Sequence, residues 1–314
     1  MPTLTGRAPA KINLALRILN RRPDGFHELR TVLQTISLAD RLKVTYRPRA
    51  KYAVDLVCDR PELDGDDNLA AVAARRLLHA GSSRGAVEIE LDKRIPVGAG
   101  LGGGSSDAAA VLLALSRMLR PAPPPDLLLT VAAGLGSDVP FFLVGGRCVG
   151  LGRGEEVYPL PDIPRQWLLV LAPDQPISTP QAYRALDSAR RTRLTAAASR
   201  NIISGFCSGV GAFQEAGTRL TTEAPPNQFV NDFETVIFQR YPELGNWKDR
   251  LVRAGASGAM LSGSGSALFG LFPGRASAAA AAQAFDAFPG KVLLAYTMGR
   301  RACRAVWESD SGGA

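Results

Sequence analysis

PVGAGLGGGSSD, residues 96–107, is the stretch that decides the fold of this 314-residue chain. Alternating apolar residues precede it at 87–92 and helically spaced apolar residues follow it at 107–119, which predicts a strand, a glycine turn and a helix. Glycine lets backbone N–H groups approach an anion without a Cβ in the way, and a helix N-terminus adds unpaired N–H groups and a positive dipole end. Ser105 and Ser106 can cap that helix and donate to phosphate oxygens. The stretch therefore predicts a phosphate-binding loop.

A linker, a dinucleotide-binding turn and a Walker A loop all fit these glycines less well. A flexible linker accounts for the composition but not for the strand before it or the apolar helix after it. The pattern G-x-G-x-x-G occurs at Gly98, Gly100 and Gly103. A dinucleotide-binding fold, however, needs a carboxylate at the end of the next strand, about 20 residues on, and residues 120–123 supply neither. Because Gly-Lys-Ser/Thr occurs nowhere in the chain, a Walker A loop is excluded.

The composition is that of a globular protein, and its positive net charge is compatible with an anionic partner. Apolar residues make up 46% and charged residues 21%, which argues against general disorder. The 37 Lys and Arg against 29 Asp and Glu give a formal net charge of +8. The basic residues are scattered and form no recognised nucleic-acid-binding module, so we expect anionic metabolites and no nucleic acid. Without an 18-residue apolar run or an apolar leader, we expect neither a membrane span nor secretion.

The cysteines and histidines show no metal-binding pattern. The four cysteines (Cys58, Cys148, Cys207 and Cys303) lie far apart, no C-x-x-C occurs, and there are only two histidines. This argues against a zinc cluster and against any mechanism that needs several histidines. A reduced, cytoplasmic setting is the default expectation.

The remainder of the chain divides near residues 150–165, a segment rich in Gly and Pro that we interpret as a domain junction. In the first half, Asp67 and Asn68 can cap a helix that starts at Leu69. The second half has an α+β pattern, and 190–227 is interpreted mostly as loop and helix. Strands are predicted at 11–19, 41–47, 87–92, 167–172, 259–262, 267–272 and 291–298, and helices at 107–119, near 180–190 and 229–254, and at 277–287.

Three further motifs carry candidate chemistry. In residues 8–14, Lys11 and Asn13 lie two apart on a predicted strand and point to the same face, although for this segment alone a solvent-facing strand with an extended lysine is the better interpretation. Asp138 lies between a tight turn and two phenylalanines, which suits either a helix cap or a catalytic carboxylate. Residues 261–267 form a second glycine-serine loop between apolar strands, for which a hairpin turn is the simplest interpretation.

Together the four motifs resemble the GHMP family, the small-molecule kinases named for galactokinase, homoserine kinase, mevalonate kinase and phosphomevalonate kinase. The resemblance covers about residues 8 to 270. Residues 22–29 (RPDGFHEL) are similar to those of the members that phosphorylate the 2-hydroxyl of 4-diphosphocytidyl-2-C-methyl-D-erythritol in the non-mevalonate isoprenoid pathway. Further support comes from Thr31, Gln34, Leu38, Asp40 and residues 231–234 (NDFE). The chain departs from these members at Phe26, where they usually have tyrosine, and in the greater length of 190–227.

The resemblance implies an α+β fold of two domains with the site in the cleft between them. Residues 1–160 would form an ATP-binding, ribosomal-protein-S5-like α/β domain whose left-handed crossover creates the phosphate loop. Residues 161–314 would form a ferredoxin-like α+β domain. The resemblance also implies ATP as co-substrate with Mg²⁺, no side chain assigned to the metal, and a cytoplasmic enzyme that is a monomer or weak homodimer.

The resemblance further implies the roles of individual residues in phosphoryl transfer. Asp138 would accept or orient the proton of the acceptor hydroxyl, and Lys11 would lie beside both and offset charge in the transition state. Asn13 would donate to the acceptor near its diphosphate or hydroxyl. The ATP site would comprise Pro96, Val97, Gly98, Ala99, Gly100, Leu101, Gly102, Gly103, Gly104, Ser105 and Ser106, with Asn68 and Lys93 on the adenine side.

For the cytidine end, the resemblance implies a stacked ring with a polar edge. Phe26 and Tyr183 would sandwich the base, and since stacking needs a π face rather than a hydroxyl, phenylalanine should serve at position 26. His27 would read the edge of the base, unless it is only a histidine in a polar turn. Thr179 would contact the acceptor from the second domain.

Two alternatives stay open at this point. Another GHMP kinase, acting on homoserine or a mevalonate derivative, would keep the glycine motifs but not the run at 24–27. A degenerate kinase fold used only for binding would have lost Lys11, Asp138 or the loop glycines, and this sequence keeps all of them.

Overall fold

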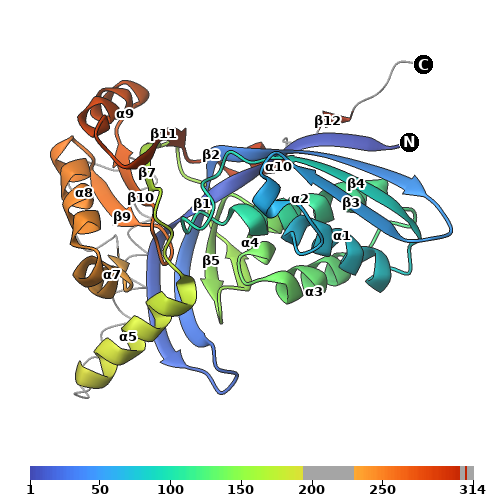
Figure 1. Cartoon of the computed structure of the whole chain (residues 1–314), viewed down its shortest axis with the longest axis horizontal. Coiled ribbons are helices and arrows are strands. Elements are labelled where there is room, and N and C mark those ends of the chain that lie inside the picture. Colours follow the sequence, from blue (N-terminus) through green and yellow to red (C-terminus); the bar gives the residue numbers. More distant parts are fainter. Residues whose placement is uncertain (194–229, 305–307, 310–314) are drawn as a thin grey trace.

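The computed structural model describes residues 1–193, 230–304 and 308–309, so the prediction for 190–227 lies almost entirely outside the described residues. Two sheets organise the molecule (Figure 1). The larger has the order β12-β1-β2-β4-β3, with β5 beside β2, β6 beside β5 and β8 beside β1. Its strands are β1 (Thr3–Arg21), β2 (His27–Pro48), β3 (Ala53–Cys58), β4 (Gly85–Asp92), β5 (Arg147–Leu151), β6 (Glu156–Pro159), β8 (Val230–Asn231) and β12 (Glu308–Ser309). The smaller sheet is β11-β7-β10-β9, formed by β7 (Trp167–Pro173), β9 (Gly258–Leu261), β10 (Leu268–Phe272) and β11 (Gly290–Tyr296).

Strands β1 and β2 form one long antiparallel hairpin that extends from the larger sheet to the side of α5 (Figure 1). Apolar residues alternate along β1, and Leu14, Leu16 and Ile18 are buried, as a strand with one covered face requires. The predicted strands at 11–19 and 41–47 are confirmed as parts of these two strands. The turn between them carries the residues that precede His27.

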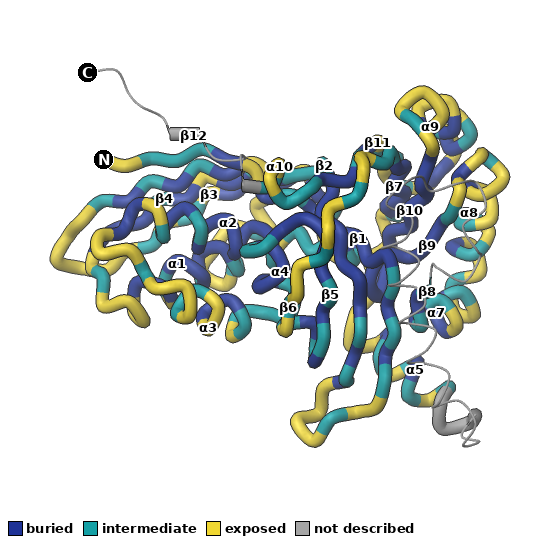
Figure 2. The backbone as a smooth tube through the Cα atoms, turned by 180° about the vertical axis from the view of Figure 1, so that it is seen from behind, coloured by how far each residue is buried: buried dark blue, intermediate teal, exposed yellow. Residues whose placement is uncertain are grey.

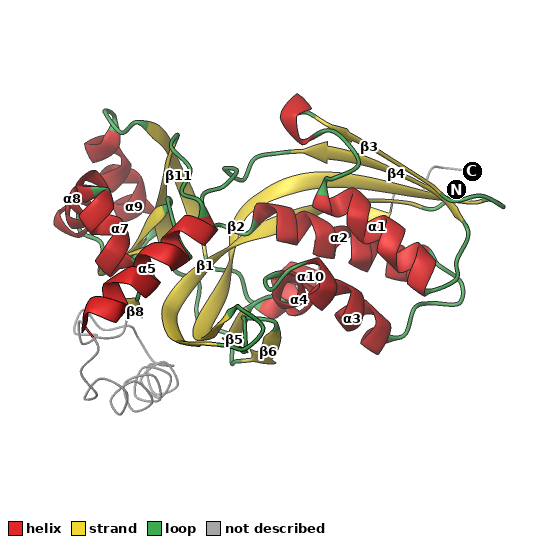
Figure 3. Cartoon of the chain, turned by 60° about the horizontal axis from the view of Figure 1, so that its bottom comes forward, coloured by secondary structure: helices red, strands yellow, loops and turns green. Residues whose placement is uncertain are grey.

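Helices cover each sheet. The first half contributes α1 (Leu69–Ala80), α2 (Gly103–Met118), α3 (Pro125–Leu135) and α4 (Val139–Val144), which lie together on one face of the larger sheet (Figure 3). The second half contributes α5 (Thr179–Arg193), α7 (Glu234–Arg240), α8 (Pro242–Arg253), α9 (Arg275–Ala282) and α10 (Arg300–Arg304). Short 3₁₀ turns occur at Pro61–Leu63 and Gln283–Phe285. Among the residues described, no helix combines the length and the apolar character that crossing a membrane requires.

Where the two sheets meet, they share a hydrophobic core. Ile12 and Leu14 of β1 pack in one buried cluster with Leu168 of β7 and Phe269 of β10. The buried stretch of β1 and β2 that supplies this contact is visible in the middle of Figure 2. The predicted α+β architecture is confirmed, and the shared core fixes the two halves against each other around the site. The domain limits 1–160 and 161–314 stay a prediction.

The start of α2 corrects one detail of the sequence prediction. The helix begins at Gly103, and Gly102, with φ +74°, occupies the cap position. Ser105 and Ser106 therefore lie inside the first turn and do not cap it, because glycine backbone already turns the chain into the helix. Ser106 donates to the carbonyl of Pro9 and so attaches α2 to β1.

Three other boundaries differ from the prediction. Much of the expected junction at 150–165 is occupied by the β5–β6 hairpin, which leaves 160–166 as the connection to the smaller sheet. The expected helix at 229–254 is β8, α7 and α8, because Pro242 lacks the N–H that a continuous helix needs and instead starts α8. The expected helix at 277–287 is the earlier and shorter α9, followed by a 3₁₀ turn.

Candidate active site

Two cavities meet at the glycine loop. The first, of ≈ 610 Å³, is lined by the loop and by residues 62–69. The second, of ≈ 830 Å³, is lined by the β1–β2 hairpin, by α5 and by the glycine-serine loop of residues 262–266. Gly100, Gly102 and Ser105 line both cavities. The two cavities therefore adjoin at this loop, where a group bound in one lies close to a group bound in the other.

The shape of the loop depends on glycine where the two glycine-rich loops touch. Gly100 has φ +77°, and a Cβ there would collide with the carbonyl oxygen of Ser262. The hydroxyl of Ser262 donates to the carbonyl of Gly100 over 3.0 Å, and the N–H of Ala267 donates to the carbonyl of Ala99 over 3.0 Å. Residues far apart in the sequence thus form one continuous wall between the cavities.

A buried ionic cluster holds the two ends of the phosphate loop. The ammonium of Lys93, just before the loop, pairs with Asp40 of β2 and donates to Asp107 of α2 over 2.7 Å. Asp40 also accepts from the backbone N–H groups of Arg94, over 2.5 Å, and Ile95, over 2.7 Å. Burial raises the pKa of Asp107 to about 8, and the charge of Asp40 acts in the same direction, while Lys93 opposes both. The cluster ties the strand that enters the loop to the helix that leaves it.

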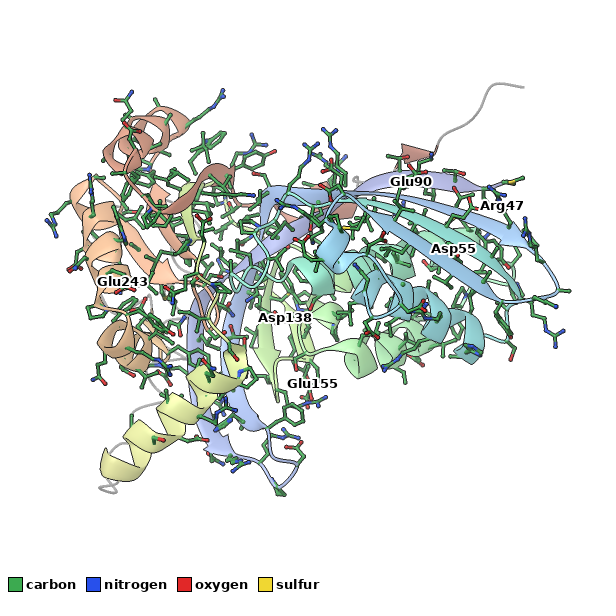
Figure 4. All side chains as sticks on the ribbon, in the orientation of Figure 1. Arg47, Asp55, Glu90, Asp138, Glu155 and Glu243 are labelled. Atoms are coloured by element: carbon green, nitrogen blue, oxygen red, sulfur yellow. The ribbon has the colours of Figure 1, made fainter. Side chains whose placement is uncertain are left out.

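Lys11, Asn13 and Asp138 line the second cavity, on the other side of this wall. Lys11 Nζ is 3.6 Å from Asp138 Oδ2 and donates to Asn13 Oδ1 over 2.7 Å. Asn13 in turn donates to Thr31 Oγ1 over 2.8 Å, so this buried amide orients the lysine. Asp138 makes no capping hydrogen bond, which counts against the helix-cap interpretation. Figure 4 labels Asp138 near the middle of the molecule, where the first-half helices and α5 approach each other.

The second cavity also contains a cluster of rings. The ring of His27 stacks on Tyr183 with centroids 4.8 Å apart, and its Nε2 is 2.7 Å from Asp187 Oδ1. Phe26 is half exposed, and the guanidinium of Arg153 lies 4.8 Å from its ring centroid. Burial, together with the charge of Asp138, raises the pKa of Tyr183 to about 12, so its hydroxyl stays protonated. His27 covers one face of Tyr183, and the sandwich of a base between Phe26 and Tyr183 stays a prediction.

Some of the proposed ligand-binding side chains have their polar groups engaged within the protein. Asn68 accepts from Ala70 N–H as the cap of α1 and donates to the carbonyl of Leu63. Lys93 belongs to the ionic cluster, and the hydroxyl of Thr179 is 2.8 Å from that of Ser264. Thr179 lines the second cavity, whereas Asn68 and Lys93 line the first cavity, and the binding roles of all three stay predictions.

Four residues that the structure places at the site were given no role there by the sequence analysis. Asp187 and Arg153 lie against His27 and Phe26, Thr31 supports Asn13, and Ser264 contacts Thr179. Asp187 follows Tyr183 by four residues on a predicted helix, a spacing that would have placed both on one face. No local signal marks Arg153, because the β1–β2 hairpin brings Phe26 to it from far away in the sequence.

Comparisons with known proteins agree with this geometry. The family models "GHMP kinases N terminal domain" and "GHMP kinases C terminal" match residues 68–146 and 211–291. The chain is 50% identical over 272 residues to 4-diphosphocytidyl-2-C-methyl-D-erythritol kinase of Solibacter usitatus, covering 86% of this chain and 81% of the relative. It is 39% identical over 284 residues to the enzyme of the same name from Geobacter metallireducens, covering 90% and 94%.

Solved structures extend the comparison. A crystal structure of 4-(cytidine 5'-diphospho)-2C-methyl-D-erythritol kinase matches with a TM-score of 0.75 and 40% identity, over 94% of this chain and 99% of the other. Homoserine kinase from Cytophaga hutchinsonii matches with a TM-score of 0.72 over 98% of this chain and 97% of the other. At 19% identity, the second match reflects the fold alone.

Proposed function

The chain belongs to the GHMP kinase family, and we propose that it transfers the γ-phosphoryl group of ATP to the 2-hydroxyl of 4-diphosphocytidyl-2-C-methyl-D-erythritol. The observation that carries this proposal is the meeting of two cavities at Gly100, Gly102 and Ser105, with Lys11 and Asp138 on the acceptor side. Phosphoryl transfer requires chiefly that two reactants are aligned and that developing charge is neutralised, and this arrangement suits both requirements.

In the proposed reaction, ATP lies in the first cavity with its phosphates along the backbone N–H groups of residues 96–106 and the start of α2. The acceptor hydroxyl lies between Asp138 and Lys11. Asp138 accepts or orients its proton, and Lys11, held by Asn13, offsets the negative charge that develops on the transferred group. Asn13 accepts from Lys11 and donates one N–H of its amide to Thr31, so we assign it to positioning Lys11, and its second amide N–H is proposed to donate toward the acceptor.

Mg²⁺ is expected with ATP as the counter-ion of its phosphates. The carboxylates of the loop cluster do not suit it, because Asp107 is buried and both Asp40 and Asp107 are engaged by Lys93. No step in the proposed transfer is assigned to a metal ligand of the protein. Cys58 and Cys148 are buried free thiols, which suits the reduced cytoplasm in which we propose that the protein acts. We further propose that it is a monomer or a weak homodimer.

The nature of the acceptor rests on the β1–β2 hairpin. Phe26, His27 and Tyr183 all line the acceptor cavity, with His27 stacked on Tyr183 and the ring of Phe26 half exposed, and such aromatic rings suit a flat base. Homoserine and mevalonate have no base to stack, so a kinase for either would have no use for these rings.

A coupled assay of ATP consumption across acceptors tests the proposal. We expect turnover only when 4-diphosphocytidyl-2-C-methyl-D-erythritol is supplied, and none at comparable kcat/KM with homoserine or mevalonate. Equal or better turnover of either alternative would overturn the assignment, while the family membership would stand.

A further inference from the structure

The segment of residues 231–234 runs from the last residue of β8 to the first residue of α7, outside the residues that the proposed transfer uses. It nevertheless contacts three parts of the site. Phe233 packs edge-on against Tyr183, with ring centroids 4.9 Å apart. Asp232 binds β1, and Asn231 and Glu234 bind the glycine-serine loop and the strand that leads into it. The segment is therefore a candidate for aligning these parts.

Asn231 makes the contacts with the greatest geometric consequence. Its side-chain nitrogen donates to the carbonyl of Leu261 over 2.8 Å and to the carbonyl of Gly263 over 2.7 Å. Its side-chain oxygen accepts from the N–H of Phe233 over 3.0 Å. The residue is 4% exposed, so both donors and one acceptor of the amide are used inside the protein. Only an asparagine-sized amide satisfies both carbonyls and the N–H at once.

The carbonyls that Asn231 fixes belong to the loop that faces the reacting centre. Gly263 has φ +58°, and a Cβ built on it would lie 3.3 Å from Lys11 Nζ and 3.3 Å from the carbonyl oxygen of Gly100. The glycine-serine loop thus lies beside the lysine, with room for little more than a glycine, and Ser262 bonds it to the phosphate loop. A shift of this loop would move Lys11 relative to both Asp138 and the loop glycines.

We propose that Asn231 is a positioning residue for phosphoryl transfer, which holds the glycine-serine loop in contact with Lys11 and Gly100. The inference rests on the proposed function for its kinetic readout, but the contact itself is independent of the acceptor. Misplacing reacting groups by about 1 Å can cost on the order of 100-fold in rate, so a residue that touches no substrate can still control kcat.

Asn231→Asp is the sharpest variant, because it keeps the shape of the side chain and removes the two donors. A carboxylate would face two carbonyl oxygens, which leaves those groups without donors in a buried place. The matched control is Asp232→Asn, the adjacent residue. Its carboxylate accepts from the N–H of Ile18 over 2.9 Å and pairs with Arg17 over 3.0 Å, and both of these partners belong to β1.

The experiment measures steady-state kinetics per folded molecule and hydrogen exchange of residues 261–267 in both variants. For Asn231→Asp we expect kcat to fall roughly 10- to 100-fold with both KM values changed less than about 3-fold, and faster exchange in the loop. For Asp232→Asn we expect kcat within about twofold of the parent protein and unchanged exchange in the loop. A KM-only effect, or equal kcat losses in both variants, would overturn the inference.

The exchange measurement needs no substrate, so it separates this inference from the proposed function. If the parent protein turns over none of the acceptors tried, the proposed function fails, and unchanged loop exchange in Asn231→Asp then also overturns the inference. If the parent protein is active and Asn231→Asp is equally active, the inference fails alone. Where Asn231→Asp does not fold, Asn231→Ala, which removes the donors without adding a charge, is measured in its place.

Discussion

The two glycine-rich loops of the site, residues 96–106 and 262–266, touch each other but are held in different ways. The phosphate loop is anchored by charges, through Lys93 between Asp40 and Asp107. The glycine-serine loop is anchored by a neutral amide, Asn231. The loop proposed to receive an anion is thus tied through the Lys93 ammonium to Asp40 and Asp107, whereas the donors that Asn231 supplies to the glycine-serine loop carry no charge.

Lys11 lies where the two loops meet, which explains why both must be fixed. Its backbone N–H donates to the carbonyl of Leu101 over 3.0 Å, and its ammonium lies against Gly263. A change at either loop therefore reaches the same ammonium. The predictions below separate this shared centre from each loop and from the distant base pocket.

Loss of Asp138 should have the largest effect. Asp138→Asn keeps the shape but removes the negative charge and the proton acceptor, so we expect kcat to fall by about 10²–10⁴. Lys11→Ala should damage turnover as well, and the double variant should be little worse than the poorer single one if the pair acts as a unit. The measurement is turnover together with the thermal midpoint of the same Asp138→Asn preparation. A less stable protein with near-normal turnover would remove Asp138 from the mechanism.

The next prediction tests the contact between the two glycine-rich loops. Gly100→Ala places a methyl group against the carbonyl of Ser262 at a positive φ, so we expect a loss of at least about 2 kcal/mol in the free energy of unfolding, measured in urea.

Gly104→Ala is the matched control within the same loop. A Cβ on Gly104 meets no atom within 4 Å and lies in a helix, so stability should hold or rise by about 0.5–1 kcal/mol. If the phosphates approach this turn closely, the KM for ATP of Gly104→Ala rises all the same. Equal destabilisation by both variants would contradict the contact between the loops.

The base pocket should respond separately from both loops. Phe26→Ala removes a stacking face worth about 1–3 kcal/mol, so the KM for the acceptor should rise roughly 5- to 150-fold while the KM for ATP changes little. Phe26→Tyr should leave both KM values nearly unchanged, since the π face is kept. An unchanged acceptor KM with a raised ATP KM would show that Phe26 contributes to the ATP site and not to the acceptor site.

Local patterns in the sequence predicted the parts of this site that depend on neighbouring residues. The strand, glycine turn and helix around 96–107 follow from periodicity and from the conformational freedom of glycine, and the cap at Asn68 follows from its place before Leu69. Lys11 and Asp138 were identified by resemblance, and the structure brings them within ion-pair distance.

What the sequence did not reveal are pairs that only the fold brings together. Asp40 reaches Lys93 because β2 lies beside β4, and Asn231 reaches Gly263 because β8 joins the edge of β1. Neither pair leaves a spacing signal in the chain. The early start of α2 was missed for a related reason, since Gly102 caps the helix through its backbone and not through a side chain.

The smallest effect should be the pH dependence that the ionic anchor imposes on stability. Because the pKa of Asp107 in the folded protein is raised to about 8, folding favours its protonated form. Its contribution to stability is complete below the pKa of the unfolded chain, about 3.8, and is lost as pH rises toward 8. The pKa of Lys93 is also raised, by Asp107 and Asp40 against the opposing effect of burial, so its own contribution is lost only above about 10.5.

The test compares thermal midpoints between pH 5 and pH 9. We expect the midpoint of the parent protein to fall across this window and that of Asp107→Asn to fall less, because asparagine cannot titrate. Asp92→Asn is the control, since it removes an exposed carboxylate paired with Arg94 in the same region. It should leave the slope of the thermal midpoint against pH unchanged. The glycine-serine loop has a neutral anchor, so Asn231→Ala should lower the midpoint without changing this slope. If Asp107→Asn kept the full slope of the parent protein, the charged anchor would not be the source of the difference between the loops.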